Sequence, residues 1–224
     1  NIPQPTFSWT NSANAYSYNL YRTNPDASQS VFSSRLSLFT DKGSRSSLQF
    51  DGSNDYANIP NSSSLNPIKI TMEAWVYPTI YNSSANIIGK RNPTEQYFTR
   101  FYGTTGRVEG YVYIDGWRYC TTNITAPLNT WSHIAATYDG ANVKVYVNGV
   151  LGCASAYAGN IAAGTDNLTI GAYTQASERF AGQIDEIRIY RQAFNAQRIS
   201  EHYQGTFNDE TNLVGLWHFD ETTG

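Results

Sequence analysis

From Ser47 onward, this chain consists mainly of short segments in which apolar and polar residues alternate, separated by turn residues. Such alternation directs one side of an extended strand toward a core and the other toward solvent. In "VKVYVNG" the three valines face one way, while Lys144 and Tyr146 face the other. The Asp-Gly pair of "YDGAN" and the Asn-Gly pair of "VNGV" supply the positive φ angles of tight hairpins. The segments that we read as strands are "SLQFDG", "ITMEAWVYP", "ANIIGKR", "QYFTRFY", "EGYVYID", "WRYCTTN", "WSHIAATYDG", "NVKVYVNG", "NLTIGAY" and "GQIDEIRIY".

One helix is predicted near the C-terminus, over "NAQRISEHY". Asn195 is a favourable N-cap, and Gly205 is a suitable stop. Ile199 and Tyr203 have the i, i+4 spacing of one helix face. Many strands with one short helix predict an all-β fold, an antiparallel two-sheet sandwich of jelly-roll type.

Composition narrows the classes of partner. The formal net charge is −3, charged residues make up 15% of the chain and no long basic run occurs, so no nucleic-acid partner is expected. No apolar run approaches the ~20 residues of a membrane-spanning helix, so no membrane insertion is expected. Aromatic residues reach 14%, which favours strands because rings fit a pleated surface.

The chain has two cysteines, Cys120 and Cys153. An even count with few lysines and many tyrosines, asparagines and threonines suits a secreted or cell-surface protein, in which the two thiols would form a disulfide. The alternative is two unrelated buried thiols.

Residues 1–45 are polar and weakly patterned, and we predict that they are edge strands or the remnant of a preceding module. Within them, "PTFSWT" and "AYSYNLYRT" are candidate short strands. Residues 46–224 form the main domain. Its final segment, 213–224 with "LVGLWHFDE", either closes the domain as a last strand or begins a next repeat.

Several motifs together point to a family. "LQFDGSNDYANIPNSSSLN", "ITMEAWVYP", "NTWSHIAATYDGANVKVYVNGVL", "LTIGAY" and "FAGQIDEIRIYRQAFNAQRISEHYQ" stand in an order that resembles the laminin-G-like, concanavalin A-like domains of bacterial secreted proteins. The resemblance implies a curved jelly roll that serves in carbohydrate binding or adhesion, attached to an enzyme or a surface protein. Both ends of the chain depart from the family pattern, since "LVGLWHFDE" usually opens such a domain.

The resemblance also implies a structural calcium ion, held between the "FDG" turn and the Asp of "QIDEIRIY". The corresponding metal-site residues here are Asp51, Gly52, Asn54 and Asp185, with backbone carbonyls nearby.

Strand alternation supports part of this calcium site. Asp185 would share a core-facing track with Ile187 and Ile189, and a buried carboxylate is costly unless it is paired or bound to a metal. The alternative is an ordinary Asp-Gly turn, with Asp185 accepting backbone hydrogen bonds or pairing with an arginine.

Aromatic side chains on the polar side of strands are candidates for stacking against sugar rings. Tyr111 and Tyr113 lie opposite core residues on one strand, and "WRY" follows a turn at Asp115. If Arg100 and Arg118 join this patch, an acidic or sulfated glycan would suit it. The alternative is that these rings cover a second sheet face without binding anything. The predicted ligand-binding residues are Arg100, Tyr102, Tyr111, Tyr113, Trp117 and Tyr119.

No catalytic constellation is evident. A glycoside hydrolase needs two carboxylates flanking the bond, whereas Asp185 and Glu186 are adjacent and point to opposite faces. The predicted function is therefore a non-catalytic, calcium-binding carbohydrate-recognition module, an accessory domain of a secreted or cell-surface protein. The alternative is a structural or adhesive domain that binds a protein partner, and a polysaccharide hydrolase or lyase is less favoured.

Overall fold

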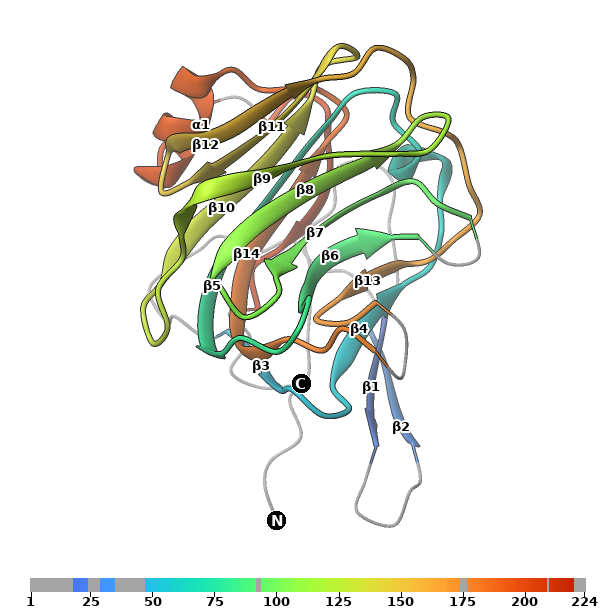
Figure 1. Cartoon of the computed structure of the whole chain (residues 1–224). Coiled ribbons are helices and arrows are strands. Elements are labelled where there is room, and N and C mark those ends of the chain that lie inside the picture. The colour runs from blue at the N-terminus through green and yellow to red at the C-terminus, as the bar shows by residue number, and fades with distance from the viewer. Residues whose placement is uncertain are drawn as a thin grey trace.

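The fold is an antiparallel sandwich of two sheets with one α-helix, as predicted (Figure 1). The computed structural model describes residues 18–23, 29–34, 47–91, 94–173, 177–208 and 210–219, the first two ranges as backbone strands only. The expected strand "PTFSWT" lies outside these ranges. Among the described residues, no helix has the length and apolar character needed to cross a membrane.

The first sheet has eight strands in the order β2-β1-β4-β13-β6-β7-β8-β9. At one edge β2 pairs with β1, and β1 pairs with β4, so these two N-terminal strands extend this sheet. The strands of the first sheet are β1 (Tyr18–Thr23), β2 (Gln29–Ser34), β4 (Tyr56–Ile59), β6 (Asn86–Lys90), β7 (Tyr97–Tyr102), β8 (Arg107–Tyr113), β9 (Trp117–Thr125) and β13 (Leu168–Ile170).

The second sheet runs β12-β11-β10-β5-β14-β15, and β3 also pairs with β14. The C-terminal strand β15 therefore joins β14 at the edge of this sheet. The strands of the second sheet are β3 (Leu48–Asp51), β5 (Ile70–Ile80), β10 (Ser132–Tyr138), β11 (Asn142–Val147), β12 (Val150–Ala156), β14 (Ala181–Tyr190) and β15 (Leu213–Trp217).

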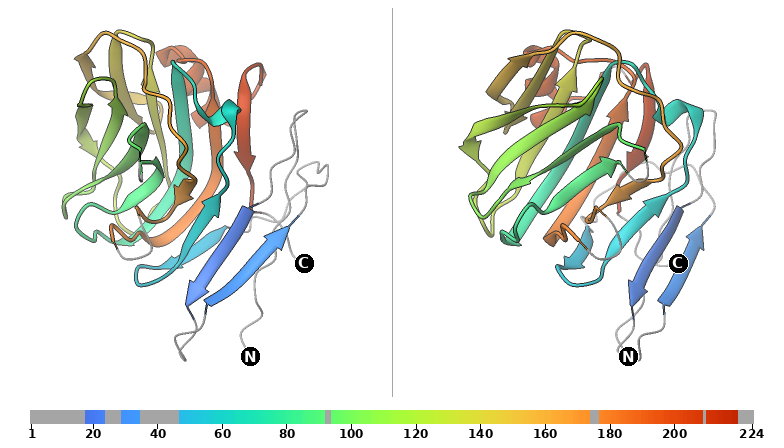
Figure 2. Two further views of the ribbon diagram at one scale, coloured as in Figure 1. Left: turned by 90° about the vertical axis from the view of Figure 1, so that its right-hand side faces the viewer. Right: turned by 45° about the vertical axis from the view of Figure 1, so that its right-hand side comes forward.

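The core lies between the sheets, where the alternating apolar residues of both meet (Figure 2). Phe101 and Val108 of the first sheet and Ile134 and Val145 of the second are all buried there. Gly110 lets the sheets approach closely, because a Cβ atom at that position would lie 2.8 Å from Val145 Cγ2. Packing of two alternating faces in this way is the usual basis of a β-sandwich.

Helix α1 (Ala196–Tyr203) begins and ends where the sequence predicts. The Asn195 side chain accepts a hydrogen bond from the Arg198 backbone N–H at 2.9 Å, which caps the first turn. After the helix, Gly205 has φ +79°, a conformation that favours glycine. A short 3₁₀ turn, η1 (Ser63–Leu65), is the other helical element in the described chain.

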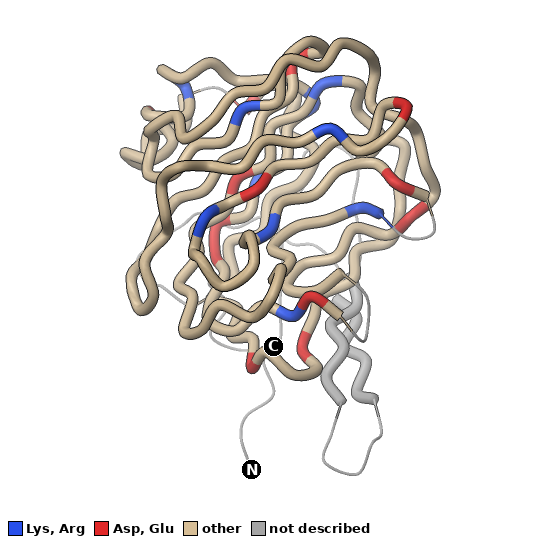
Figure 3. Tube along the Cα trace, viewed as in Figure 1, with Lys and Arg blue, Asp and Glu red and all other residues tan. Residues whose placement is uncertain are grey.

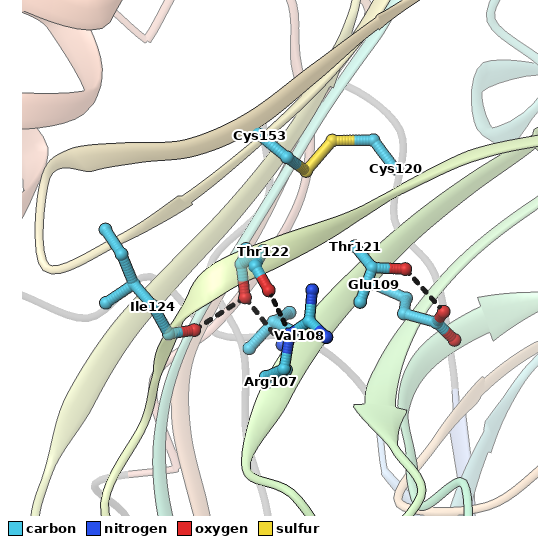
Figure 4. The surroundings of a disulfide bond; sticks show 8 residues. All are labelled: Arg107, Val108, Glu109, Cys120, Thr121, Thr122, Ile124 and Cys153. Atoms are coloured by element: carbon cyan, nitrogen blue, oxygen red, sulfur yellow. Dashed lines mark hydrogen bonds between the residues drawn. A yellow bond between two sulfur atoms is a disulfide. The ribbon is translucent and has the colours of Figure 1, made fainter.

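The predicted disulfide between Cys120 and Cys153 is present (Figure 4). Cys120 lies on β9 and Cys153 on β12, which are edge strands of different sheets, and their Cα atoms are 6.0 Å apart. The bridge therefore ties the two layers together along one side of the sandwich.

Candidate functional site

Three aromatic rings form a stack across β7, β8 and β9. The strand register places Phe98 opposite Tyr111, and Tyr111 opposite Tyr119. The ring centroids of Phe98 and Tyr111 are 4.1 Å apart, and those of Tyr111 and Tyr119 are 4.8 Å apart, with near-parallel planes in both pairs. Cross-strand ring pairs of this kind stabilise a sheet. We call Phe98, Tyr111 and Tyr119 the ring column.

Trp117 stands across the ring column. It lies opposite Tyr113 in the register, and the two rings meet edge to face at 5.3 Å. Its plane is also nearly perpendicular to those of Phe98 and Tyr111, with centroids 4.9 and 5.9 Å away. Tyr113 and Trp117 therefore adjoin the column, so most of the predicted aromatic patch is assembled on one face.

The rings of the column differ in how much of their surface reaches solvent. Phe98 is 2% exposed, because it lies between Tyr111 and the guanidinium of Arg91, whose carbon is 3.8 Å from the ring centroid. Tyr111 is buried between Phe98 and Tyr119. Tyr119, on the edge strand, is 45% exposed. Within the column, Tyr119 is thus the ring that can offer its surface to a ligand.

Arg100 is held by several acceptors beside the column. Its Nε donates to Glu109 at 2.9 Å, its NH2 to the Tyr111 hydroxyl at 3.0 Å, and its NH1 to Glu178 at 3.4 Å. Burial acts to lower the pKa of Arg100, but the hydrogen bond to Glu109 raises it above its ordinary value. Arg100 is therefore a charged side chain with a structural role, and its charge is balanced by the carboxylates of Glu109 and Glu178.

Glu109 lies at the centre of this hydrogen-bonded network and is 1% exposed. Besides Arg100, it accepts a hydrogen bond from the Tyr111 hydroxyl at 2.9 Å. Figure 4 shows a further bond, which Thr121 Oγ1 donates to Glu109 at 2.8 Å. Burial and the adjacent Glu109 charge raise the pKa of Tyr111. Both oxygens of the buried carboxylate are satisfied, as buried charges require.

Arg91, Glu109 and Glu178 are site residues that sequence reasoning missed. Arg91 forms an ion pair with Glu178, and its guanidinium lies between the rings of Phe98 and Tyr173. Strand alternation could have indicated Glu109, since it shares a strand face with Tyr111. Glu178 lies outside the strands, and no local pattern marks it.

Two residues stand apart from the column. Tyr102 is on the same face and is also 45% exposed. The group that lies over its ring is the guanidinium of Arg107, whose carbon is 5.9 Å from the ring centroid. Arg118 lies opposite the core residue Val112 and pairs with Asp115 at 2.5 Å. The expectation that Arg118 and Arg100 share one patch is wrong, because neighbouring residues of a strand point to opposite faces.

The predicted Asp51–Asp185 clamp is not formed. Asp51 lies opposite Ala181 in the β3–β14 register, four residues from Asp185. That spacing corresponds to ~13 Å along a strand, whereas oxygens that share one calcium ion lie within ~5 Å of each other. These residues do not fit a shared calcium site.

The "FDG" turn itself is hydrogen bonded. Asp51 Oδ1 accepts the backbone N–H groups of Ser53 at 2.7 Å and Asn54 at 3.2 Å, and Gly52 has φ +76°. Asp55 in turn accepts the Asp51 backbone N–H at 3.1 Å. These are the bonds of an ordinary Asp-Gly turn. No group of three or more His, Cys, Asp or Glu side chains that could hold a metal occurs in the described ranges, so calcium binding stays a prediction.

Asp185 does not face the core, because β14 contains a bulge. The register with β5 shifts between Asp185 and Arg188, and Glu186 has φ +51°. Ile184 and Ile187 are both buried in the core. The extra residue reverses the alternation, so Asp185 points outward instead of sharing a track with Ile187.

A second buried carboxylate, Glu73, lies on the outer face of the other sheet, beneath α1. Its Oε2 lies 2.8 Å from His202 Nδ1 of the helix and 3.8 Å from His133 Nε2 of β10. Buried atoms without a hydrogen-bond partner among the described residues include Glu73 Oε1, His133 Nδ1 and His202 Nε2. The helix covers this group completely.

Comparison with known families matches residues 51–200 to the model of the concanavalin A-like lectin/glucanases superfamily. No curated protein matches the chain. Among solved structures, a candidate carbohydrate-binding protein from Bacteroides ovatus is similar, with a TM-score of 0.62 and 15% identity over 95% of this chain and 62% of that one.

Two further solved structures share the fold. Domain 4 of AbnA, an extracellular arabinanase from Geobacillus stearothermophilus solved with arabinotriose, has a TM-score of 0.57 and 19% identity over 88% of this chain and 85% of that one. The binding domain of botulinum neurotoxin serotype G has a TM-score of 0.57 and 16% identity over 70% of this chain and 41% of that one. At these identities the likeness shows the fold alone.

Proposed function

The chain belongs to the concanavalin A-like lectin/glucanase superfamily, and we propose that it is a non-catalytic carbohydrate-recognition module that binds sugar on the outer face of β7, β8 and β9. The fold is one on which binding modules and enzymes both occur, so the proposal rests on the site. The observation that carries it is the exposed Tyr119 ring at the sheet edge, set beside Trp117 and backed by a fully bonded polar network.

This arrangement suits a sugar because a pyranose or furanose ring has an apolar C–H face and a polar rim. The C–H face can stack on Tyr119, and the hydroxyl groups can reach the hydroxyl of Tyr113 nearby. The stacked column holds Tyr119 in place, and a ring that is already ordered loses little conformational entropy on binding.

A non-catalytic role fits the state of the buried acid. Glu109 accepts hydrogen bonds from Arg100, Tyr111 and Thr121, which occupy both of its oxygens. Arg100 also bridges toward Glu178. A hydrolase needs two carboxyl groups that reach the bond from either side, and Glu109 is 1% exposed with both oxygens already occupied.

Secretion is part of the proposal. The Cys120–Cys153 bridge supports it, since disulfides persist in oxidising compartments. The calcium ion implied by the family resemblance remains a prediction that requires a donor set without Asp185.

Affinity electrophoresis through gels that contain single polysaccharides tests the proposal. The wild-type chain should be retarded by at least one polysaccharide, and Tyr119→Ala and Trp117→Ala should be retarded clearly less while keeping the wild-type circular dichroism spectrum. If no polysaccharide retards the folded wild-type chain, carbohydrate binding is excluded.

The alternative is an adhesive domain that binds protein. The exposed apolar pair Val150 and Leu151 on β12 favours it, because neither side chain is buried by the sandwich. Loss of a protein partner in Leu151→Ser, with no retardation by any polysaccharide, would support this second function.

A further inference from the structure

We infer that the glycan bound by this face is neutral, recognised by stacking on Tyr119 and Trp117 and by uncharged hydroxyl contacts instead of by a cation. The inference rests on the proposed carbohydrate binding and specifies the chemical class of its ligand. It replaces the expectation of an acidic or sulfated glycan.

The first argument is that the two arginines of the site already have carboxylate partners. Arg100 bonds to Glu109 and Glu178, and Arg91 forms an ion pair with Glu178. Arg91 is buried, and both of its faces lie against rings. To reach Arg100, an anionic sugar would have to compete with Glu109, a buried carboxylate that would then lose its guanidinium partner.

The second argument concerns the end of the face where Tyr119 and Trp117 lie. Asp115 precedes Trp117 in the turn and pairs with Arg118, which points to the opposite side of β9. Exposed Glu95 precedes β7, and the adjacent Gln96 carbonyl accepts the Tyr113 backbone N–H at 2.7 Å. The charge of Asp115 is balanced by Arg118, whereas the exposed Glu95 carboxylate near this end of the face would repel a uronate or sulfate group.

Charges of both signs are distributed over this side of the molecule and do not form a patch of one sign (Figure 3). Segments 92–93 and 174–176, which adjoin the site in sequence, contain no charged residue. An acidic polysaccharide needs a concentrated positive field for attraction. The charges beside the site and the wider charge distribution of this side therefore both disfavour binding of an acidic polysaccharide.

Arg107 is the exception, and it lies away from the exposed rings. It is at the start of β8 opposite Tyr102, whereas Tyr119 pairs near the other end of that strand. Its Nε donates to the Thr122 carbonyl. An acidic glycan, if bound, would be drawn to Arg107 and Tyr102, which gives the test a separate readout.

The test compares retardation by neutral polysaccharides (arabinan, xylan, mixed-linkage glucan) with that by acidic ones (polygalacturonate, alginate, heparin), each at low and high salt. We expect retention on a neutral polysaccharide that salt does not weaken, and about tenfold weaker binding in Tyr119→Ala, which corresponds to ~1.4 kcal/mol. Tyr102→Ala is the matched control, because Tyr102 has the same exposed fraction on the same sheet and should bind as wild type.

Preferential retention on an acidic polysaccharide, weakened by salt and by Arg107→Gln, would overturn the inference while leaving carbohydrate binding intact. Loss of neutral binding in Tyr102→Ala and not in Tyr119→Ala would also overturn it. Silence on every polysaccharide would instead refute the proposed function itself, and the inference with it.

Discussion

A buried carboxylate lies on the outer face of each of the two sheets, but the two carboxylates are stabilised by different kinds of partner. Glu109 of β8 and Glu73 of β5 are both 1% exposed. Glu109 is bonded by Arg100, Tyr111 and Thr121 on the sheet itself, while Glu73 depends on His202 from α1 and on His133. The first face needs no helix to bury its charge, whereas the second is completed by one (Figure 2).

The comparison separates a recognition surface from a structural one. On the face of β7, β8 and β9, the buried side chains are packed and hydrogen bonded without a covering helix, and Tyr119 stays at the surface. On the face beneath α1, the outward-facing side chains of the strands pack against the helix. The rings of Trp75 and Tyr203 stack there, with their centroids 5.8 Å apart. Changes on the first face should therefore affect binding, and changes on the second should affect stability.

The largest expected effect is that of Glu73→Ala. Removing one partner of a buried ionic group typically costs ~3–5 kcal/mol, and here it leaves His202 and His133 without their acceptor. Urea unfolding measures the loss, with exposed Glu95→Ala as control. Retained stability in Glu73→Ala, or abolished glycan binding in its folded fraction, would break the distinction between the faces.

Reduction of the disulfide should come next. The Cys120–Cys153 loop has a sequence separation of 33, for which the loop-entropy model gives ~3–4 kcal/mol. Because Cys120 adjoins Tyr119 on the edge strand β9, the double variant C120S/C153S should lose glycan affinity as well as stability. Calorimetry and affinity electrophoresis on the same sample check this, and unchanged binding would show that β9 is held without the bridge.

The acid dependence of stability should come from the face beneath α1. Burial acts to raise the pKa of Glu73, but the neighbouring His133 and His202 side chains outweigh it and hold the pKa below its ordinary value of 4.5. The ionised carboxylate is thus favoured by folding, so its contribution is complete above about pH 4.5 and is lost as pH falls through the lower folded value.

Urea midpoints measured across the acid range test this assignment. Glu73→Gln should be less stable than wild type at neutral pH and should lose less further stability on acidification. Parallel curves for the two proteins would show that the acid dependence arises elsewhere, for example at Glu186, whose pKa is also lowered although burial opposes it, by His218 and Arg188.

Two tyrosine variants distinguish the two faces through smaller changes in stability and in glycan binding. Tyr203→Ala removes a ring stacked on Trp75 and should cost ~0.5–1.5 kcal/mol of stability beyond lost area, without affecting glycan binding. Tyr119→Ala should lower binding and change stability less. Thermal melts and affinity gels on both variants give the four values, and the reverse pattern would contradict the assignment of the two faces.

The smallest effect expected is that of calcium. A ligand that binds the native state alone raises the melting midpoint. If the predicted ion binds at the turn of Asp51, Gly52 and Asn54, added calcium should raise the midpoint over that in chelator, and Asp51→Asn should abolish the shift while Asp185→Asn leaves it. An unchanged wild-type midpoint would remove calcium from the account.

Alternation in the sequence predicted most of the strands and which residues of β8 share a face, although β2 and β4 were not among the predicted segments. The N-cap, the i, i+4 spacing and the stop residue predicted the helix. Alternation also predicted that Tyr111 and Tyr113 lie together, because side chains two apart on a strand always do. It did not predict that β7, β8 and β9 are neighbours in the order that stacks Phe98, Tyr111 and Tyr119, since register depends on contacts between distant segments.

Two errors have the same physical origin. The bulge at Glu186 reverses the alternation of β14, so the orientation of Asp185 could not be read by counting. The partners of Arg100 include Glu178 from outside the strands, so its neutralisation was invisible in the local pattern. Both features depend on tertiary packing.

Titration of the isotope-labelled chain with a neutral oligosaccharide, followed by NMR, tests the central claim most directly. We predict that the amide and ring signals of Tyr119, Trp117 and Tyr113 shift first, while those of α1 and its docking strand β5 stay fixed. Shifts concentrated on α1 and β12, with Tyr119 unmoved at saturation, would contradict the account.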